Sequence, residues 1–438
     1  MALELAPCGA ASVDERGTGQ RIAAYPLLIV LLAVSLGVSG VPAPLYGIYE
    51  ERWHLAPITT TLVFAVYAIG ALGAVLVAGA VSDRVGRKPL LVGSVIAMVV
   101  GLVVFMTAHG VAALFVARAL HGGAVGTVVV VASAALLDLR PEHGARSGHL
   151  TGITVNVGMA VTILTASLLA QYGPDPLVTP YAVVGLVALA LLLALLPMPE
   201  THLARSTAPV RIARPAVPES IRADFRFAVL GVMASWSVLG VYLSLFPAFA
   251  GVSTGIHSLV FGGLVVAAMA GSGAISQAFG GRIDPRRAAV LGDFGTAVAL
   301  VLSLLALDSH HASLVALAAV VMGLNFGLAF GGSLRYLGRV VPADRRGEVM
   351  SAYYVLAYGA MAVPTILAGW AATVWSLSTI FPWFTAAVAA ACLTAGALGL
   401  LTARTARGPR GAGVAWRRRD PAGSLGVREV TGSGSGPP

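Results

Sequence analysis

The sequence predicts an all-α membrane protein with twelve transmembrane helices in two pseudo-symmetric six-helix bundles. The composition, the spacing of long apolar runs and an internal repeat support this class. Of the 438 residues 57% are apolar, and the mean hydropathy is +0.86. Surface-to-volume scaling leaves a soluble fold unable to hide so much apolar surface, whereas lipid as the surrounding solvent removes that difficulty.

Twelve mostly apolar runs are each long enough to cross a bilayer, which takes ~20 residues of helix. Runs that are apolar on all sides indicate helices, because the strands of membrane barrels alternate in polarity and are about half as long. Proline, glycine and charged residues separate the runs. With edges good to a few residues, they are 25–47, 58–81, 89–108, 110–138, 148–170, 179–198, 225–250, 257–280, 287–307, 311–334, 348–372 and 378–402.

A proline-rich stretch with scattered arginines divides the runs into two sets of six. A repeat supports this division, because Gly79 and Asp83 recur at an offset of 201 residues as Gly280 and Asp284. Parallel halves of this kind place a substrate near the membrane midplane, between them. The predicted divisions are an N-terminal tail 1–24, a first bundle 25–198, a linker 199–224, a second bundle 225–402 and a disordered C-terminal tail 403–438.

The basic residues indicate the orientation of the chain. If the N-terminus is cytosolic, 26 of the 28 lysines and arginines fall in cytosolic tails or loops, or at their edges, the exceptions being Arg52 and Arg118. Cytosolic loops of membrane proteins carry such an excess. We therefore expect a multi-pass protein of the inner (plasma) membrane with both termini in the cytosol. The net charge of +9 then faces anionic lipid, so no nucleic-acid partner is expected.

A charged cluster stands out between the second and third runs, in a chain where only 11% of residues are charged. Residues 79–88 read Gly-Ala-Val-Ser-Asp-Arg-Val-Gly-Arg-Lys, which predicts a tight polar turn at the end of a membrane hairpin. The spacing Gly-x-x-x-Asp-Arg-x-Gly-Arg-Lys resembles the signature loop of the major facilitator superfamily. The resemblance implies the major facilitator fold and a secondary transporter similar to bacterial drug:proton antiporters.

The resemblance also implies a conformational latch. In the superfamily this loop holds the first half against the start of helix 11 in the outward-open state, and one of its basic residues pairs with an acid at the end of helix 4. A generic basic loop on the cytosolic side is the alternative. The matching latch residues are Gly79, Asp83, Arg84, Gly86, Arg87, Lys88 and Asp138.

Arg118 lies inside the fourth run, where a guanidinium costs ~2.5–3.5 kcal/mol on insertion scales and so needs a partner or a cavity. The surrounding sequence resembles the superfamily's helix 4 motif Arg-x-x-x-Gly, which is linked to proton transfer. His121 follows one turn later, and Asp293 is the acid clearly within a run. The predicted proton-coupling residues are therefore Arg118, His121 and Asp293. The alternatives are an arginine bonded to backbone carbonyls, a packed histidine and uncoupled facilitated diffusion.

Polar and aromatic side chains within the runs are candidates for contact with a substrate, although each alone also fits simple packing. The runs supply little charge, which favours a neutral or weakly cationic amphipathic molecule. The candidate substrate-binding residues are Tyr67, Asn156, Trp236, Tyr242, Asn325, Tyr354 and Tyr358.

Proton-coupled efflux of a small amphipathic drug or metabolite by alternating access is the predicted function. The alternatives are proton-coupled uptake of a sugar-like or organic solute, and a non-transporting membrane receptor on the same fold. The chain lacks a Gly-x-x-x-x-Gly-Lys-[Ser/Thr] loop, so ATP hydrolysis is excluded. We expect no enzyme activity, no cofactor and no metal, and a monomer whose partners are a small-molecule substrate, protons and the lipid bilayer.

Overall fold

The computed structural model describes residues 15–140, 144–202 and 214–405, and within these ranges it contains helices and no strand. Eleven helical segments of this part are long and apolar enough to cross a membrane. The remaining predicted span corresponds to α7 (Thr179–Leu195), whose 17 residues reach the lower limit of ~17–25 for a transmembrane helix. The predicted all-α membrane fold is confirmed.

The first span of the N-terminal half is broken into pieces. Helix α1 (Glu15–Gly40) starts before the predicted run at residue 25 and ends ahead of Pro42 and Pro44, which lack backbone N–H donors. A 3-10 turn and a short helix complete the span. They are η1 (Ala43–Leu45) and α2 (Tyr46–Trp53). The later spans of this half are α3 (Pro57–Val85), α4 (Arg87–Met106), α5 (Val111–Leu139), α6 (Gly144–Tyr172) and α7.

The first span of the C-terminal half is broken in a similar place. Helix α8 (Arg222–Ser244) ends three residues before Pro247, and α9 (Phe246–Thr254) completes the span. The remaining elements of this half are η3 (Glu219–Ile221), α10 (Leu259–Gly280), α11 (Pro285–Asp308), α12 (Ala312–Val340), η4 (Ala343–Arg345), α13 (Arg346–Val374) and α14 (Leu377–Thr405).

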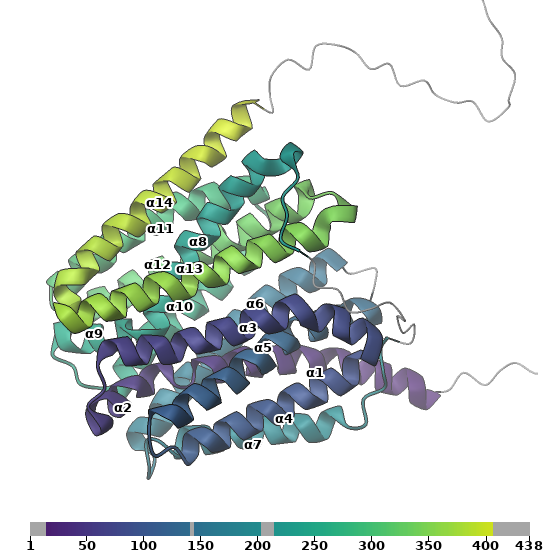
Figure 1. Cartoon of the computed structure of the whole chain (residues 1–438), viewed down its shortest axis with the longest axis horizontal. Coiled ribbons are helices and arrows are strands. Elements are labelled where there is room, and N and C mark those ends of the chain that lie inside the picture. Colours follow the sequence, from purple (N-terminus) through teal and green to yellow (C-terminus); the bar gives the residue numbers. More distant parts are fainter. Residues whose placement is uncertain (1–14, 141–143, 203–213, 406–438) are drawn as a thin grey trace, which may run out of the picture.

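The long helices run in roughly one direction and form two halves that lie side by side (Figure 1). Helix α1 begins and α14 ends at the same end of the bundle, which also carries the turns after α3, α5, α7, α10 and α12. We call it the basic end, because those turns hold most of the loop arginines, and we call the other the opposite end. The tails predicted at 1–24 and 403–438 lie largely outside the described residues, whereas the linker predicted at 199–224 is described at 199–202 and 214–224.

Glycines bring helices within each half into backbone contact. In α5, Gly122 and Gly126 lie so close to α3 that a Cβ on either would overlap an α3 carbonyl oxygen. In α12, Gly323 and Gly327 are placed in the same way against α10. These two pairs are separated by the same 201 residues as the repeat in the sequence. Small residues allow such close approach of membrane helices, so the two halves share one packing pattern.

The boundary between the halves is formed mainly by α3 against α13 and by α6 against α10. At the opposite end, the backbone N–H of Ile58 donates to Thr373 Oγ1 over 3.1 Å. At the same end, Gln171 Oε1 of α6 accepts from Ser258 Oγ over 2.8 Å and from the N–H of Val260 over 3.1 Å. These hydrogen bonds join the two halves at the opposite end.

Helix α13 continues through Pro364. Proline removes the donor that would serve the carbonyl four residues earlier. That carbonyl belongs to Ala360, and it accepts instead from Ser237 Oγ of α8 over 2.9 Å. The same hydroxyl also lies 2.8 Å from Met233 O within α8. A side chain of α8 therefore satisfies the backbone of α13 at the proline.

A valine at Gly323 should destabilise the C-terminal half, because its side chain would overlap the Met269 carbonyl of α10. We expect Gly323→Val to lose roughly 1–3 kcal/mol of stability through overpacking. The matched control is Gly338→Val in the same helix, where a Cβ meets nothing within 4 Å. Thermal unfolding of the detergent-purified variants measures the difference, and equal melting temperatures would show that the contact is unimportant.

Candidate functional site

The turn between α3 and α4 depends on Gly86, whose φ of +111° lies in a region that other residues rarely adopt. Its N–H donates to Ser82 O over 2.9 Å and closes the last turn of α3. A Cβ at this position would collide with the carboxylate of Glu200, which approaches from the end of α7. The glycine therefore serves both the sharp turn and a tertiary contact.

Arg87 follows this glycine, and its side chain is only 8% exposed. The guanidinium lies 2.6 Å from Asp83 Oδ1 and donates through Nε to Asp138 Oδ2 over 3.2 Å. A third donation goes to the hydroxyl of Ser82. Two carboxylates therefore pair with one buried arginine, and the pair with Asp138 ties α4 to the end of α5.

The contact predicted between this turn and helix 11, which is α13 in the structure, is not made in this conformation. Within the described residues, no hydrogen bond or ion pair joins 79–88 to α13. Arg84 is exposed, and Lys88 Nζ donates over 2.6 Å to the carbonyl of Leu196, the residue that follows α7. Gly79 lies in α3 with the nearest atom to its Cβ position at 3.7 Å, on Val130. The turn is thus bound within its own half.

Glu200 is a member of this cluster that sequence reasoning missed. Its carboxylate accepts from the N–H groups of Arg87 over 2.9 Å and Lys88 over 3.2 Å, so it caps the start of α4. Partial burial acts to raise the pKa of Glu200, but the N–H donors of His202, Arg87, Lys88 and Thr201 outweigh it and hold that pKa below its ordinary value. The sequence signal that could have identified Glu200 is its position as an acid directly after the last helix of the N-terminal half.

The C-terminal half carries a related pair with its charges reversed. Asp284 lies 201 residues after Asp83, and Arg339 lies 201 residues after Asp138. Arg339 Nη1 is 3.4 Å from Asp284 Oδ2, and both side chains are at least half exposed. Asp284 also caps α11 by accepting from two backbone N–H groups. In this half the acid of the pair lies in the turn after α10 and the base lies at the end of α12, whereas in the first half Arg87 lies in the turn and Asp138 at the end of α5.

Arg118 is completely buried in α5 and is held by the broken first span. Its Nε donates to Tyr46 Oη over 2.8 Å, and its Nη1 donates to Ser39 O over 2.7 Å. Carbonyls in the last turn of a helix lack an internal partner, so the end of α1 at Gly40 makes the Ser39 carbonyl available. The rings of Tyr46 and Tyr67 each lie 5.4 Å from the guanidinium carbon.

His121 is also fully buried, and it faces α4. Its Nε2 lies 3.3 Å from Met98 O, and because a carbonyl can only accept, this nitrogen carries the hydrogen. Gly101 leaves space for the ring, and Phe105 lies 5.4 Å from it. The other ring nitrogen, Nδ1, has no hydrogen-bond partner among the described residues.

Asp293 lies inside the C-terminal half, in α11, and is 1% exposed. Neither carboxyl oxygen has a hydrogen-bond partner within the described part of the chain. Gly231 of α8 provides the space, because a Cβ there would lie 2.7 Å from Oδ1. The three predicted coupling residues are therefore buried, but they do not form one cluster: Arg118 and His121 are in one half and Asp293 is in the other.

Three of the predicted substrate residues lie on helices that meet at the boundary. Trp236 of α8 and Tyr358 of α13 pack edge to face at 4.8 Å, and Tyr67 lies on α3, which packs against α13. The indole Nε1 of Trp236 is buried with no partner among the described residues. Also at the boundary, Asn156 of α6 donates to Gly152 O, and its Oδ1 lies 3.4 Å from the Cβ position of Gly273 in α10.

Two other predicted residues point into the C-terminal half instead. Tyr242 lies 3.3 Å from Ser303 Oγ of α11 and stacks on Phe246. Asn325 of α12 fills the space left by Gly295 of α11. Their positions on α8 and α12 direct them toward α11, away from the boundary. The last candidate, Tyr354, packs edge to face against its neighbour Tyr353 at 5.6 Å.

Comparison with known proteins gives a family and a group of relatives. The family model described as Major Facilitator Superfamily matches residues 27–364. Multidrug resistance protein MdtL of Klebsiella pneumoniae subsp. pneumoniae is 27% identical over 206 residues, which cover 46% of this chain and 50% of that protein. The protein of the same name from Salmonella paratyphi C is 30% identical over 168 residues, or 37% and 38% of the two chains. The matched region thus spans half or less of these relatives.

Neutralising Glu200 should weaken the cap on α4 in a pH-dependent way. Because the folded-state pKa of Glu200 lies below its ordinary value of 4.5, its stabilising effect is present above that value and is lost as the pH falls through the folded pKa. We expect Glu200→Gln to melt several degrees below wild type at pH 7, with the gap closing below about pH 4.5. Thermal unfolding across pH measures this.

The control for this prediction is Glu219→Gln, an acid that is 83% exposed and pairs with Arg222 at the end of the linker. An exposed pair contributes little, so this variant should melt with wild type at every pH. A gap for Glu200→Gln that persists unchanged to pH 3 would contradict the charged cap.

Proposed function

Because the chain belongs to the Major Facilitator Superfamily, we propose that it is a secondary transporter that exports a small amphipathic molecule by alternating access. The observation that carries the proposal is the arrangement of the halves, each tightly packed within itself and joined to the other at the opposite end. In this family of folds, the two halves rock about a site near the midplane. The relatives named multidrug resistance proteins favour efflux over uptake.

The proposed orientation places the basic end in the cytosol, as the excess of arginine there favours. The ties at Ile58–Thr373 and Gln171–Ser258 then close the outer side. An exporter in this state would receive its substrate from the cytosol or the inner leaflet, and breaking these ties would release it outside.

The proposed substrate contacts are the aromatic side chains where α3, α8 and α13 meet. Trp236 offers an unused N–H donor beside the ring of Tyr358. Aromatic rings with one free donor suit a largely apolar molecule that carries a hydrogen-bond acceptor. This chemistry favours a neutral amphipathic substrate over a sugar or an organic anion.

Proton coupling is proposed to involve Asp293 and His121. Burying an unpaired charge costs far more than burying a neutral acid, so the isolated Asp293 carboxyl is suited to holding a proton away from water. His121 has a free acceptor nitrogen for a second proton. Arg118 cannot readily release a proton, and its proposed role is to fix Tyr46 and the broken first span.

The transport test uses cells that lack their own efflux pumps, together with a panel of toxic compounds. We expect the chain to raise resistance to one or more amphipathic compounds and to accumulate them in everted vesicles under an imposed pH gradient. A protonophore should abolish that accumulation. Accumulation in right-side-out vesicles alone would favour uptake, and absence of transport in both vesicle types would favour a receptor.

Within that assay, Asp293→Asn should abolish gradient-driven accumulation but keep downhill exchange, because the amide cannot take up a proton at this site. His121→Gln should act in the same direction. The matched control is Asp308→Asn, an exposed acid at the end of the same helix, which should transport as wild type does. Unchanged accumulation in both test variants would place coupling elsewhere.

Arg87→Ala should reduce transport at least tenfold while leaving membrane insertion intact, because it leaves Asp83 and Asp138 without their shared partner. Because Asp83 and Asp138 are partly exposed, the loss of their shared partner costs less than the ~3–5 kcal/mol of a fully buried pair. Arg339→Ala removes the reversed and exposed pair of the other half and should have little effect. Accumulation in everted vesicles at matched expression compares them, and equal losses would contradict a special role for the N-terminal turn.

A further inference from the structure

A cavity of about 470 Å³ lies between α8, α13 and α14 in the C-terminal half, away from the boundary between the halves. Its volume falls in the range of ligand sites. Its lining is apolar except for Ser237, whose hydroxyl already serves the Ala360 carbonyl. Leu356 and Val363 of its wall are 38% and 56% exposed, so the cavity faces the lipid side of the bundle.

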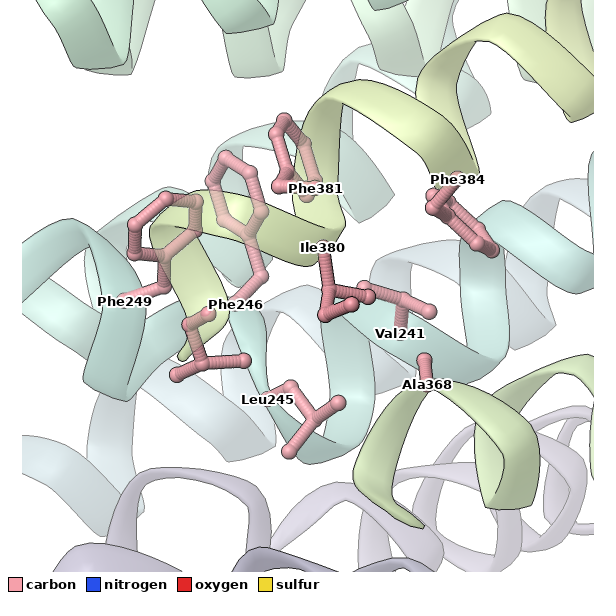
Figure 2. A pocket seen from close by; sticks show the side chains of 9 residues that line it. Val241, Leu245, Phe246, Phe249, Ala368, Ile380, Phe381 and Phe384 are labelled. Atoms are coloured by element: carbon pink, nitrogen blue, oxygen red, sulfur yellow. The ribbon is translucent and has the colours of Figure 1, made fainter. Parts of the chain in front are cut away.

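Aromatic side chains close this cavity at the opposite end. Phe381 at the start of α14 packs against Phe246 and Phe249 of α9, with ring centroids 5.7 and 5.3 Å apart (Figure 2). Phe384, one turn further along α14, borders both this aromatic cluster and the cavity. Any long apolar occupant must therefore extend toward the basic end.

Arg226 lies at that end on the same face of α8 as the cavity wall. Residues 226, 230, 234 and 237 recur at helical spacing, and the last three line the cavity. From Arg226 to Ser237 the helix rises about 16 Å, close to the thickness of one leaflet of a ~30 Å hydrocarbon core.

The guanidinium of Arg226 is available for a ligand. It is exposed and has no ion-pair or hydrogen-bond partner among the described residues. The neighbouring acid, Asp224, already accepts from the hydroxyl of Tyr336 over 2.5 Å. Two neighbouring arginines at this end are engaged: Arg222 pairs with Glu219, and Arg286 donates to Gly399 O.

We propose that Arg226 and this cavity form a binding site for one anionic phospholipid, with the phosphate at the guanidinium and an acyl chain in the cavity. The planar guanidinium matches a phosphate in geometry and charge. The apolar walls match a hydrocarbon chain, and the closed aromatic end limits how far it extends. The basic end is also where anionic lipid is expected if it faces the cytosol. The site depends on the membrane setting of the chain and not on what it transports.

The test measures lipid binding to the full purified chain. The protein is titrated with dioleoyl phosphatidylglycerol or dioleoyl phosphatidylcholine, and native mass spectrometry counts the lipids bound. We expect wild type to bind one phosphatidylglycerol more tightly than phosphatidylcholine. Arg226→Gln should weaken phosphatidylglycerol binding about fivefold and remove the preference. The control Arg287→Gln, an exposed arginine on α11 that does not line the cavity, should bind as wild type does.

The cavity is tested separately by filling it. Gly359→Leu places a side chain where a Cβ meets nothing within 4 Å, and Ala387→Phe fills the cavity from α14. Both should weaken the binding of both lipids, whereas Gly338→Leu on α12 should not. Melting temperatures identify any variant that has failed to fold.

Three results would overturn the proposal. The first is equal binding of the two lipids by wild type. The second is phosphatidylglycerol binding in Arg226→Gln that matches Arg287→Gln. The third is displacement of phosphatidylglycerol by glycerophosphoglycerol, the headgroup without acyl chains, at equal concentration, because the cavity would then contribute nothing.

Discussion

The need to satisfy the backbone polar groups inside hydrocarbon governs this structure. It explains where the helices can break and which side chains lie beside the breaks. The end of α1 exposes the Ser39 carbonyl, and Arg118 supplies the donor. Pro364 leaves the Ala360 carbonyl without a helical partner, and Ser237 of another helix replaces it. An irregularity in one helix thus requires a specific residue on a neighbour, and this links the two in position.

The two halves share a backbone plan but not their chemistry. The glycine contacts of α5 on α3 and of α12 on α10 repeat at one offset, and so do the turn positions after α3 and α10. The turn acid Asp83 recurs as Asp284, but its arginine partner differs: a buried Arg87 in one half, and an exposed Arg339 at the position of Asp138 in the other. The position equivalent to Arg118 is Ala319, and that equivalent to Asp293 is Val92. Each half therefore contributes a buried ionisable group that the other lacks.

Sequence reasoning could predict the features that depend on local pattern. Apolar length predicted the helices, and the charged segment 79–88 predicted the turn. The pairing of Arg87 with Asp138 was implied by the resemblance to the family's loop and not by local pattern. It missed Glu200, because nothing in the sequence states that the end of α7 lies against the start of α4. It also could not tell which face of a buried helix meets the boundary, so Tyr242 and Asn325 were grouped with Trp236 although they point toward α11. On helices that are apolar all round, hydrophobic periodicity carries little directional information.

The glycine contacts have a mechanical consequence. Where backbones touch with no side chain between them, there is nothing to compress or rotate, so neighbouring helices can only move together. Across the boundary, the ties at the opposite end pass through the ends of threonine, serine and glutamine side chains, whose torsions can change at modest energy. Rigidity is thus concentrated inside each half and compliance between them. A protein built in this way bends along one seam, whichever end of the bundle is being opened.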